Sequence, residues 1–477
     1  MKIIYLRNIY LSSFILLIAV LTQGCKKTNS TSSTQTPIAP TVTTISTIIN
    51  VTSTTAESGG VITSIGNAAI TEDGICYSST NATPTTSDTK LTAPVASNQL
   101  QYPPFISNLT GLTPNTTYYV RAYAHNTAGA AYGSVVKFTT SASLTAITTQ
   151  VITFAGNGTA GYADASGLSA QFNNPEGITI GNNGNLYVSD SYNGIIREVT
   201  PAGAVSTVAG TTTIGYTDGA AATAQFYAPH GSAFDAQGNL YVADFGNNVI
   251  RKITPAGIVS TYAGNGTAGY RNGAATSANL TGTSDTLAVF NNPQAVAVDA
   301  NGNVYVADRG NNVIRKILTT GRVVTLAGHR TAGYVDATGA SAAFDNPSGL
   351  VVDGQGNVFV SDQANSAIRK ITTAGAVSTI AGGNTQATLL NFPSAIAIDK
   401  TGNLFIVDEG GRIFEYTTAS VLYNLAGTAN TSGFVNGAGT SALFNNPQGI
   451  AVDANGNIYV ADQYNNCIRK ITVTLTN

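Results

Sequence analysis

The chain has 477 residues, of which 43% are hydrophobic and 10% charged, and its formal net charge is −2. This length exceeds that of one ordinary domain, and the apolar content suffices for buried cores, which argues against a disordered chain. No run of lysine and arginine is longer than two residues, as at Lys26-Lys27. A nearly neutral chain of this kind lacks the electrostatic footprint of nucleic-acid-binding proteins, so no nucleic-acid partner is expected.

The N-terminus has the pattern of a targeting segment. Lys2 and Arg7 precede an apolar run at residues 11–21, which is shorter than the about 20 residues of a membrane-spanning helix. The run ends in LTQGC, which resembles the lipobox of bacterial lipoproteins, although Leu21 lies one position further from Cys25 than is usual. The resemblance implies that residues 1–24 are a signal peptide and that Cys25 is lipidated. An ordinary signal peptide followed by a coincidental cysteine is the alternative.

The segment after the cleavage site is predicted to be a flexible tether. Residues 25–40 are polar, rich in serine and threonine, and have no apolar period. Lys26 is not the acidic residue expected of an inner-membrane retention signal. The predicted location is therefore the bacterial cell envelope, with a lipid anchor in the outer membrane.

Residues 41–140 are predicted to form a small β-sandwich. Short β-prone runs such as TVTTIST, GVITSIG and TYYVRAYAHN are separated by turn clusters. In TYYVRAYA, Tyr118, Val120 and Ala122 fall on one face, and Tyr123 falls on the opposite face. This alternation is typical of a strand with one buried side.

The second half of this region carries the L-x-P-x-T-x-Y pattern at Leu112, Pro114, Thr116 and Tyr118. The pattern resembles that of fibronectin type III modules. The resemblance implies a spacer or adhesion unit.

Residues 148–477 contain one recurring unit, so they are predicted to form a single repeat domain. The unit reads NNP-x-G, an apolar strand, D-x-x-G-N, LYVAD, a short loop, NN-x-IRKIT, a turn and VST-x-AG. The D-x-N-G-N string predicts a tight hairpin rather than a calcium loop, because the rest of an EF-hand is missing. The second strands end at Asp190, Asp244, Asp308, Asp362, Asp408 and Asp462.

The ends of the array predict a closed ring. The last repeat stops at IRKITVTLTN without a VST-x-AG strand, and a matching strand precedes the first repeat at residues 151–156. An N-terminal strand that completes the last blade closes the ring and removes open edges. The predicted fold is therefore all-β: a six-bladed β-propeller, closed by its N-terminal strand and preceded by a small β-sandwich.

These units resemble NHL repeats, in the glycine-rich form of teneurin-like propellers. The fifth unit departs most from the pattern. Residues 413–416 read IFEY in place of IRKI, and the loop before this unit is shortened to GGNTQATLLNFP. This blade is expected to be distorted.

The strand order predicts two unlike faces. The D-x-x-G-N and TPAG turns lie on one side, here called the hairpin face. The loops from AG to NNP and those after each VAD lie on the other, here called the long-loop face. Because binding residues gather on long loops of rigid scaffolds, the long-loop face is the predicted binding face.

Residues that recur in every unit are assigned to the scaffold. The aspartates are expected to accept backbone N–H bonds in their loops, and the arginines to pair with carboxylates or carbonyls. The recurring loop aromatics are expected to pack the long loops down. The arginines are Arg197, Arg251, Arg315, Arg369 and Arg469, and the aromatics are Tyr162, Tyr216, Tyr270, Tyr334 and Phe434.

Residues that differ from unit to unit are the candidates for ligand binding. The middle residue of P-x-G or P-x-A should rim the channel, since it begins the innermost strand. A second varied position follows the VAD aspartate and holds Ser191, Phe245, Arg309, Gln363, Glu409 and Gln463. From these two positions the predicted ligand-binding residues are Glu176, His230, Gln294, Arg309, Ser348 and Gln448.

These features favour a non-catalytic envelope protein that binds a protein, peptide or glycan without a cofactor. The alternative is a metal-dependent enzyme, similar to gluconolactonases and peptidyl-hydroxyglycine lyases, whose channel metal needs several His, Asp or Glu ligands. Only His230 and His329 lie in the propeller, so neither a metal site nor a catalytic residue is predicted. A structural or adhesive surface role is a third possibility. Cys76 and Cys467 are predicted to be small buried residues.

Overall fold

The computed structural model describes residues 36–93, 104–141, 146–280, 286–383 and 389–476. In these ranges the chain forms β-strands and single-turn 3-10 helices and no α-helix, which confirms the all-β prediction. No described helix has the length and apolar character needed to span a bilayer. The predicted signal peptide, Cys25 and most of the predicted tether lie outside the described residues.

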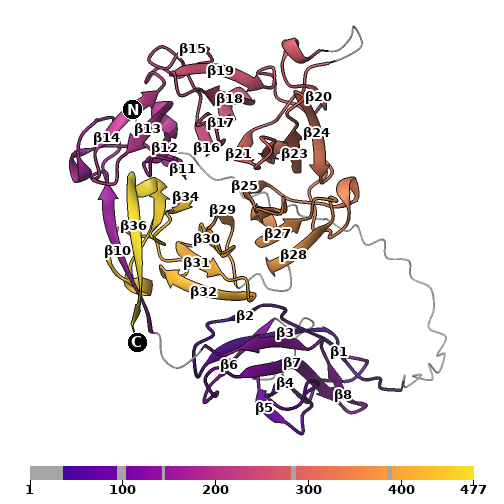
Figure 1. Cartoon of the computed structure of the whole chain (residues 1–477). Helices are drawn as coiled ribbons and strands as arrows, with labels where there is room; N and C mark the ends of the chain where they lie inside the picture. Colours follow the sequence, from indigo (N-terminus) through magenta and orange to yellow (C-terminus); the bar gives the residue numbers. More distant parts are fainter. Residues whose placement is uncertain (1–35, 94–103, 142–145, 281–285, 384–388, 477) are drawn as a thin grey trace, which may run out of the picture.

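The first unit consists of two facing β-sheets, drawn in indigo and violet in Figure 1. One sheet contains β1 (Thr41–Thr44), β2 (Ile48–Ile49), β3 (Ala56–Ser64) and β6 (Phe105–Leu109). The other contains β4 (Glu72–Ser78), β5 (Thr89–Thr92), β7 (Thr117–Asn126), β8 (Gly129–Tyr132) and β9 (Val136–Thr139). Leu109 of the first sheet and Ile75 and Val120 of the second share one buried core.

One residue of β7 departs from the predicted alternation. Tyr118, Val120 and Ala122 are buried as predicted, but Tyr123, placed on the opposite face, is buried as well. Its hydroxyl donates a hydrogen bond of 2.6 Å to Glu72 Oε1. A tyrosine whose polar end has a partner can be buried at little penalty, and the alternation alone does not reveal that partner.

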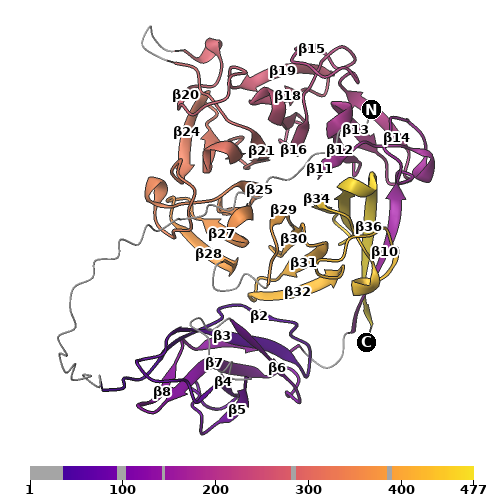
Figure 2. The same cartoon turned by 180° about the vertical axis from the view of Figure 1, so that it is seen from behind.

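The second unit consists of six antiparallel sheets of the described residues, placed around a common axis (Figures 1 and 2). The first sheet has β11 (Pro175–Ile180), β12 (Leu186–Asp190), β13 (Ile195–Val199) and β14 (Val205–Ala209). The second has β16 (Pro229–Phe234), β17 (Leu240–Asp244), β18 (Val249–Ile253) and β19 (Ile258–Ala263). The third has β21 (Pro293–Val298), β22 (Val304–Asp308), β23 (Val313–Ile317) and β24 (Arg322–Ala327).

The remaining sheets repeat this order of strands. The fourth has β25 (Pro347–Val352), β26 (Val358–Asp362), β27 (Ala367–Ile371) and β28 (Val377–Gly382). The fifth has β29 (Pro393–Ile398), β30 (Leu404–Asp408), β31 (Arg412–Tyr416) and β32 (Val421–Ala426). The sixth has β34 (Pro447–Val452), β35 (Ile458–Asp462), β36 (Cys467–Thr476) and β10 (Ala146–Ala155).

Each sheet packs its face against the next, so the hydrophobic core lies between the sheets. The inner strands contact one another in a circle, in the order β11, β16, β21, β25, β29, β34 and back to β11. Ile178 and Val188 of the first sheet share a buried cluster with Ala461 of the sixth. Cys467 is buried in the sixth sheet, and Cys76 is buried in the first unit, as predicted.

The pairing of β10 with β36 closes the ring as the sequence predicts. The two strands are antiparallel, and Val151 lies opposite Ile471. The first strand of the array thus becomes the outer strand of the last sheet (Figure 1). Val151 is fully buried in the core of that sheet.

The outer strands do not end as open edges, because a further segment lies along each of them. In three sheets the preceding long loop adds a two-residue strand: β15 (Gly219–Ala220) on β19, β20 (Gly273–Ala274) on β24, and β33 (Gly437–Ala438) on β10. In the first and fourth sheets the loop makes single bridges, Ser166 to Ala204 and Thr338 to Ala376. The long loops are therefore partly used to cover edges.

The fifth sheet is covered by the N-terminal unit instead of a long loop. β2 runs parallel to β32, with Ile48 opposite Val421 and Ile49 opposite Leu422. The backbone N–H of Asn50 donates to the carbonyl of Leu422 at 3.2 Å. The sheets of the two units are therefore continuous, and β2 lies along the kind of edge that long loops cover in the other sheets.

The single-turn helices follow two recurrent positions. Those after the second strands are η2 (Ser191–Asn193), η3 (Phe245–Asn247), η5 (Arg309–Asn311), η7 (Gln363–Asn365) and η9 (Gln463–Asn465). Those in the long loops are η1 (Gly167–Ser169), η4 (Ser277–Asn279), η6 (Gly339–Ser341) and η8 (Gly439–Ser441).

Replacing Ile48 by alanine is expected to expose the edge of the fifth sheet. Ile48 is 2% exposed and packs on Val421, and removing such a side chain typically lowers the free energy of unfolding by about 2–5 kcal/mol. Hydrogen exchange should become faster at Asn50 and along β32 but not along β24, which β20 covers. Ile258→Ala, at a side chain 48% exposed, is the control. Unchanged protection of β32 would contradict the role assigned to β2.

Candidate functional site

The inner strands surround a channel with a narrow neck at the long-loop face. The residues that follow the six strand-initial prolines line this neck: Glu176, His230, Gln294, Ser348, Ser394 and Gln448. The neck has a volume of about 70 Å³. Toward the hairpin face the channel widens to about 430 Å³, lined by side chains such as Ile180, Val298 and Ile398. The neck is therefore the narrow part of this channel, and a large ligand would lie across it.

A sharp reversal of the chain places each neck residue. The residue before each proline has a positive φ, for example 52° at Asn174 and 49° at Asn292, a conformation that asparagine adopts more readily than most residues. Pro175 then pairs with Asp190, and the register shifts before Ile178. Such a bulge re-aims the side chain beside it, and here it directs Glu176 into the neck.

Glu176, His230, Phe245 and Gln463 form one group at the neck, here called the Glu176 arc. His230 Nδ1 lies 2.8 Å from Glu176 Oε2, and Gln463 Nε2 donates to Glu176 Oε1 at 2.8 Å. The Phe245 ring stacks on the His230 imidazole, with centroids 4.3 Å apart and planes 5° apart. Glu176 is 9%, His230 8% and Gln463 7% exposed, so these groups are fixed in place by their neighbours.

A second group, here called the Glu409 arc, spans four successive sheets. Glu409 Oε1 accepts hydrogen bonds from Gln363 Nε2 at 2.7 Å and Gln448 Nε2 at 3.1 Å. Arg309 continues the arc, because its Nη2 donates to Gln363 Oε1 at 3.1 Å and its Nη1 donates to Gln294 Oε1 at 3.4 Å. The two arcs together bring polar side chains of all six sheets to the mouth of the channel.

The structure brings five of the six predicted binding residues into these arcs, and Ser348 is the exception. Ser348 lines the neck but is fully buried, and its hydroxyl donates to the carbonyl of Pro393 at 3.1 Å. Ser394 makes the equivalent bond to Pro447 at 3.1 Å. These serines link neighbouring inner strands, so Ser348 is left out of the proposed contact set.

The predicted set did not include Gln363, Glu409 and Gln463, although the structure places all three in the arcs. The sequence signal for them exists, because they occupy the same varied position after the VAD aspartate as Arg309. Each follows directly on a buried aspartate, such as Asp362 before Gln363. This places their side chains over the neck.

Three buried polar atoms of this region make no hydrogen bond with described residues: His230 Nδ1, Ser232 Oγ and Arg309 Nε. The approach of His230 Nδ1 to Glu176 is therefore a close contact without hydrogen-bond geometry. A buried polar atom without a partner carries a penalty of about 1–3 kcal/mol. An oxygen or nitrogen atom of a ligand or water that reaches these atoms would relieve that penalty.

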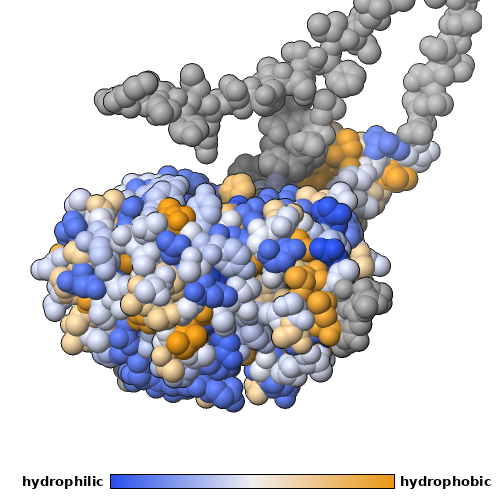
Figure 3. All heavy atoms as spheres, turned by 90° about the horizontal axis from the view of Figure 1, so that it is seen from above, coloured by the Kyte–Doolittle hydropathy of each residue, from blue (hydrophilic) through white to orange (hydrophobic). Residues whose placement is uncertain are grey.

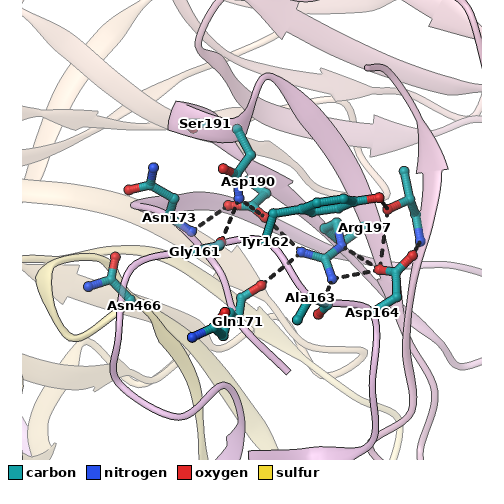
Figure 4. Close-up of polar contacts among 12 residues, drawn as sticks. Gly161, Tyr162, Ala163, Asp164, Gln171, Asn173, Asp190, Ser191, Arg197 and Asn466 are labelled. Carbon is teal, nitrogen blue, oxygen red and sulfur yellow. Dashed lines mark hydrogen bonds and ion pairs between the residues drawn. The ribbon is translucent and has the colours of Figure 1, made fainter. Parts of the chain in front are cut away.

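Buried arginine–aspartate pairs hold the long loops onto the sheets (Figure 4). Arg197 is fully buried and donates to Asp190 at 2.8 Å, to Asp164 at 2.6 Å and to the carbonyl of Gln171 at 3.0 Å. Asp190 also accepts the backbone N–H of Asn173 at 2.7 Å. The aspartate thus accepts a backbone N–H group, and the arginine pairs with carboxylates and a carbonyl, so both predictions for these scaffold residues are confirmed. The same aspartate pairing occurs at Arg251, Arg315, Arg369 and Arg469.

Burial makes these aspartates dependent on their partners. Loss of solvent raises the pKa of Asp190 and of Asp362 to about 6, against the opposing effect of N–H donors and the arginine. Burial raises the pKa of Asp308 as well. An isolated carboxylate would not remain charged at such a site, so the backbone N–H donor, the asparagine side chain and the arginine together favour its ionised form.

The loop aromatics cover the buried arginines from outside. The Tyr162 ring lies 5.2 Å from the guanidinium carbon of Arg197, and its hydroxyl is 3.0 Å from Thr207 Oγ1. This geometry is typical of a cation–π contact. Tyr162 is still 47% exposed, so it packs the loop with one face and leaves the other face open.

The fifth sheet keeps its ion pair by a different route. Phe414 stands where the other sheets have arginine, and Arg412, two positions earlier, donates to Asp408 at 2.7 Å. The Arg412 guanidinium lies 4.8 Å from the Phe414 ring. The expected distortion is limited, because β29 to β32 remain paired in the usual order.

The second histidine of the alternative metal site does not reach the neck. His329 follows β24 and is not among the residues that line the channel there. Within the described ranges, no three or more His, Cys, Asp or Glu side chains are grouped so that they could hold a metal ion. The structure therefore does not bring the two histidines together.

Comparison with known proteins detects NHL repeats in this chain. The matched segments are residues 172–197, 290–317 and 444–471, which lie in the first, third and sixth sheets. Among curated proteins, the chain is similar to Protein SUPPRESSOR OF QUENCHING 1, chloroplastic, from Arabidopsis thaliana, with 27% identity over 338 residues. The match covers 67% of this chain and 27% of that protein, so the chain spans about a quarter of the length of this relative.

Several solved structures are similar to this chain at low identity, and the first of them supports the fold. A structural genomics protein of unknown function from Bacteroides thetaiotaomicron is 16% identical, with 92% of this chain and 98% of that chain covered and a TM-score of 0.51. A streptogramin B lyase is 17% identical, with 69% and 98% covered and a TM-score of 0.43. An auxiliary nutrient binding protein from Bacteroides ovatus is 15% identical, with 92% and 98% covered and a TM-score of 0.37. These structures include both an enzyme and a binding protein.

Replacing Arg315 by methionine is expected to lower the free energy of unfolding by about 3–5 kcal/mol, because Asp308 would stay buried without its partner. The double variant Asp308→Asn, Arg315→Met should be more stable than Arg315→Met, since no charge is left unpaired. Denaturant unfolding measures both. Arg271→Met, at an exposed side chain, should change stability by no more than about 0.5 kcal/mol. An Arg315→Met protein as stable as this control would contradict the scaffold role.

Proposed function

We propose that this chain is a non-catalytic binding protein of the bacterial cell envelope, which takes its ligand at the mouth of the channel on the long-loop face. The observation that carries the proposal is the pair of arcs. They assemble side chains that differ from repeat to repeat into a fixed polar ring. A repeated scaffold uses the same residue in sheet after sheet, as five of the six sheets do with their buried arginine, and has no use for Glu176, His230 and Arg309.

The geometry supports binding across the mouth. The side chains of both arcs are held by one another before a ligand arrives, and such preorganisation limits the ordering that a ligand must impose. Glu409 uses one carboxylate oxygen for Gln363 and Gln448. Arg309 Nε is an unpartnered donor among the described residues. A protein segment, a peptide or a glycan that presents hydroxyl, amide or carboxylate groups can pair with this ring.

The second candidate is a lyase-like or lactonase-like enzyme in the same channel. It is favoured by one contact, the 2.8 Å approach of His230 Nδ1 to Glu176 Oε2, because it places two groups that can carry a proton side by side. The described residues offer this pair no third metal ligand. Binding is therefore the better-supported function.

The proposed cellular location is the outer membrane, to which a lipid on Cys25 would anchor the protein. The support is the LTQGC segment at the end of the apolar run. Two or more acyl chains give stable anchoring, and the tether would hold the two folded units away from the bilayer.

Arg309→Ala is expected to weaken ligand capture about tenfold, which corresponds to about 1.4 kcal/mol. Protein comprising residues 26–477 would be immobilised and exposed to envelope extracts, separated into protein, peptide and glycan fractions. The retained ligand would then be titrated against each variant. Lys137→Ala, at an exposed lysine of the first unit, should leave capture unchanged.

Two outcomes would count against this function. Equal affinity of Arg309→Ala and the unchanged protein would remove the channel mouth from the binding site. One equivalent of a transition metal retained by the purified protein, and lost in His230→Ala, would favour the enzyme instead.

Cys25→Ser is expected to abolish incorporation of labelled fatty acid and to move the protein from the membrane fraction to the soluble fraction. Cys76→Ala is the matched control, since it removes another of the three cysteines and should keep the label. Label that persists in Cys25→Ser would refute the proposed anchor.

A further inference from the structure

Two tyrosines beside the neck stand where the other sheets have glycine or alanine. Tyr192 is the second residue of η2, and Tyr464 is the second residue of η9. The corresponding residues of the other sheets are Gly246, Gly310, Ala364 and Gly410. Tyr192 is 60% and Tyr464 is 56% exposed. The fold does not require these rings, because the fourth sheet forms the same turn with alanine.

The two tyrosines lie on adjacent sheets and are joined by a short chain of hydrogen bonds. Asn466 Oδ1 accepts the backbone N–H of Asn174 at 3.0 Å, and Asn466 Nδ2 donates to the carbonyl of Tyr464 at 3.4 Å. Tyr192 in turn donates its backbone N–H to the carbonyl of Asn173 at 3.1 Å. Figure 4 shows Asn466 and Asn173 beside each other at this boundary.

A third tyrosine extends the row onto the second sheet. Tyr227 is 48% exposed, and its ring rests against Gly246, where an added Cβ would lie 2.5 Å from the ring. Ser191 Oγ donates to the carbonyl of Pro229 at 2.5 Å, so the turn of Tyr192 touches the segment of Tyr227. Tyr464, Tyr192 and Tyr227 are here called the tyrosine crescent.

The tyrosine crescent borders the Glu176 arc. Tyr464 follows Gln463 directly in the chain, and Tyr227 lies three residues before His230. Exposed aromatic faces thus stand next to a carboxylate and a side-chain amide. Aromatic faces accept the apolar C–H side of a sugar ring, and carboxylates and amides pair with its hydroxyl groups.

We propose that the tyrosine crescent binds a neutral glycan chain, with sugar rings stacked on Tyr464, Tyr192 and Tyr227 and hydroxyl groups directed toward the Glu176 arc. This inference rests on the proposed function and names the class of ligand for the same mouth. The narrow neck agrees with a chain that lies flat, because a volume of about 70 Å³ admits a hydroxyl or water but no bulky anchor.

The charge of this surface disfavours other polymers. Neither the tyrosine crescent nor the Glu176 arc contains a lysine or arginine, and Glu176 adds negative charge, so an anionic glycan would be repelled. A stable protein partner usually inserts aromatic or arginine anchors into pockets of the interface, and the neck is too small for such an anchor. A neutral glycan is not repelled by Glu176 and does not need to insert a side chain into the neck.

The test uses the lipid-free protein, residues 26–477, in native gels that contain one polysaccharide each. The neutral probes are an α-glucan, a β-glucan, a mannan and a xylan, and polygalacturonate is the anionic comparison. We expect at least one neutral probe to retard the protein. Tyr192→Ala combined with Tyr464→Ala should raise the Kd for that probe at least tenfold.

Matched variants separate stacking from folding. Tyr192→Phe combined with Tyr464→Phe keeps the aromatic faces and should keep the Kd within about twofold. Ile258→Ala, at a residue of similar exposure on another part of the ring, should leave binding unchanged. Thermal unfolding of the double alanine variant should match that of the unchanged protein, since Ala364 occupies the same turn position in the fourth sheet.

Three outcomes would overturn the inference: retardation by polygalacturonate alone, retardation by no neutral probe, or neutral binding that survives the double alanine substitution. One of these outcomes can occur while Arg309→Ala still weakens the capture of a peptide or protein from the envelope extract. In that case the mouth is a binding site for another class of ligand. The proposed function then stands without the glycan. If, in addition, Arg309→Ala captures the ligand from the extract as well as the unchanged protein does, the glycan inference and the proposed binding function both fail.

Discussion

The backbone N–H and C=O groups along the edge of a β-sheet pair readily with any other strand, and a protein made of many short sheets must occupy every such edge. In this chain the inner strands of neighbouring sheets pack beside one another around the channel. The outer edges are covered in two ways: by two-residue strands or single bridges of the long loops on five sheets, and by β2 on the fifth sheet of the ring. The connection between the two units follows from this requirement, because the loop before the fifth sheet is shortened and β2 lies along that edge instead.

The same long loops are fixed at their other end by the buried arginines. Arg197 binds Asp190 at the end of a strand and Asp164 and Gln171 in the loop, so strand and loop share one set of hydrogen bonds. With the frame secured by repeated residues, the positions at the mouth are free to differ. Recurring residues therefore hold the frame, and varied residues stand beside them. Arg309 and Glu409 each follow the recurring aspartate, and His230 follows the recurring proline. The candidate site is polar for this reason, although the walls of the channel are largely aliphatic.

Much of this arrangement is predictable from the chain alone, because it depends on counting and on local chemistry. The upstream strand at residues 151–156 pairs with the final IRKIT segment, as the offset of the repeats predicts. Buried arginines and aspartates can be assigned from their recurrence. The pairing of Ile48-Ile49 with Val421-Leu422 could not be predicted, since a two-residue strand has no periodicity and its partner is about 370 residues away in sequence. The hydrogen bonds among Gln363, Glu409 and Gln448 depend on rotamers that repeats do not encode. The replacement of an arginine by Phe414 with Arg412 as substitute is likewise visible only in three dimensions.

The pairing of β10 with β36 has a consequence for the order of folding. The strand that closes the ring, β10, is made before the other strands of the propeller, and its partner, Cys467–Thr476, is made after them. Contacts between such distant segments form slowly, because the intervening chain must be ordered before they become favourable. A chain synthesised from its N-terminus therefore cannot complete the propeller until Cys467–Thr476 has been made, and premature closure of the ring is prevented by the connectivity itself.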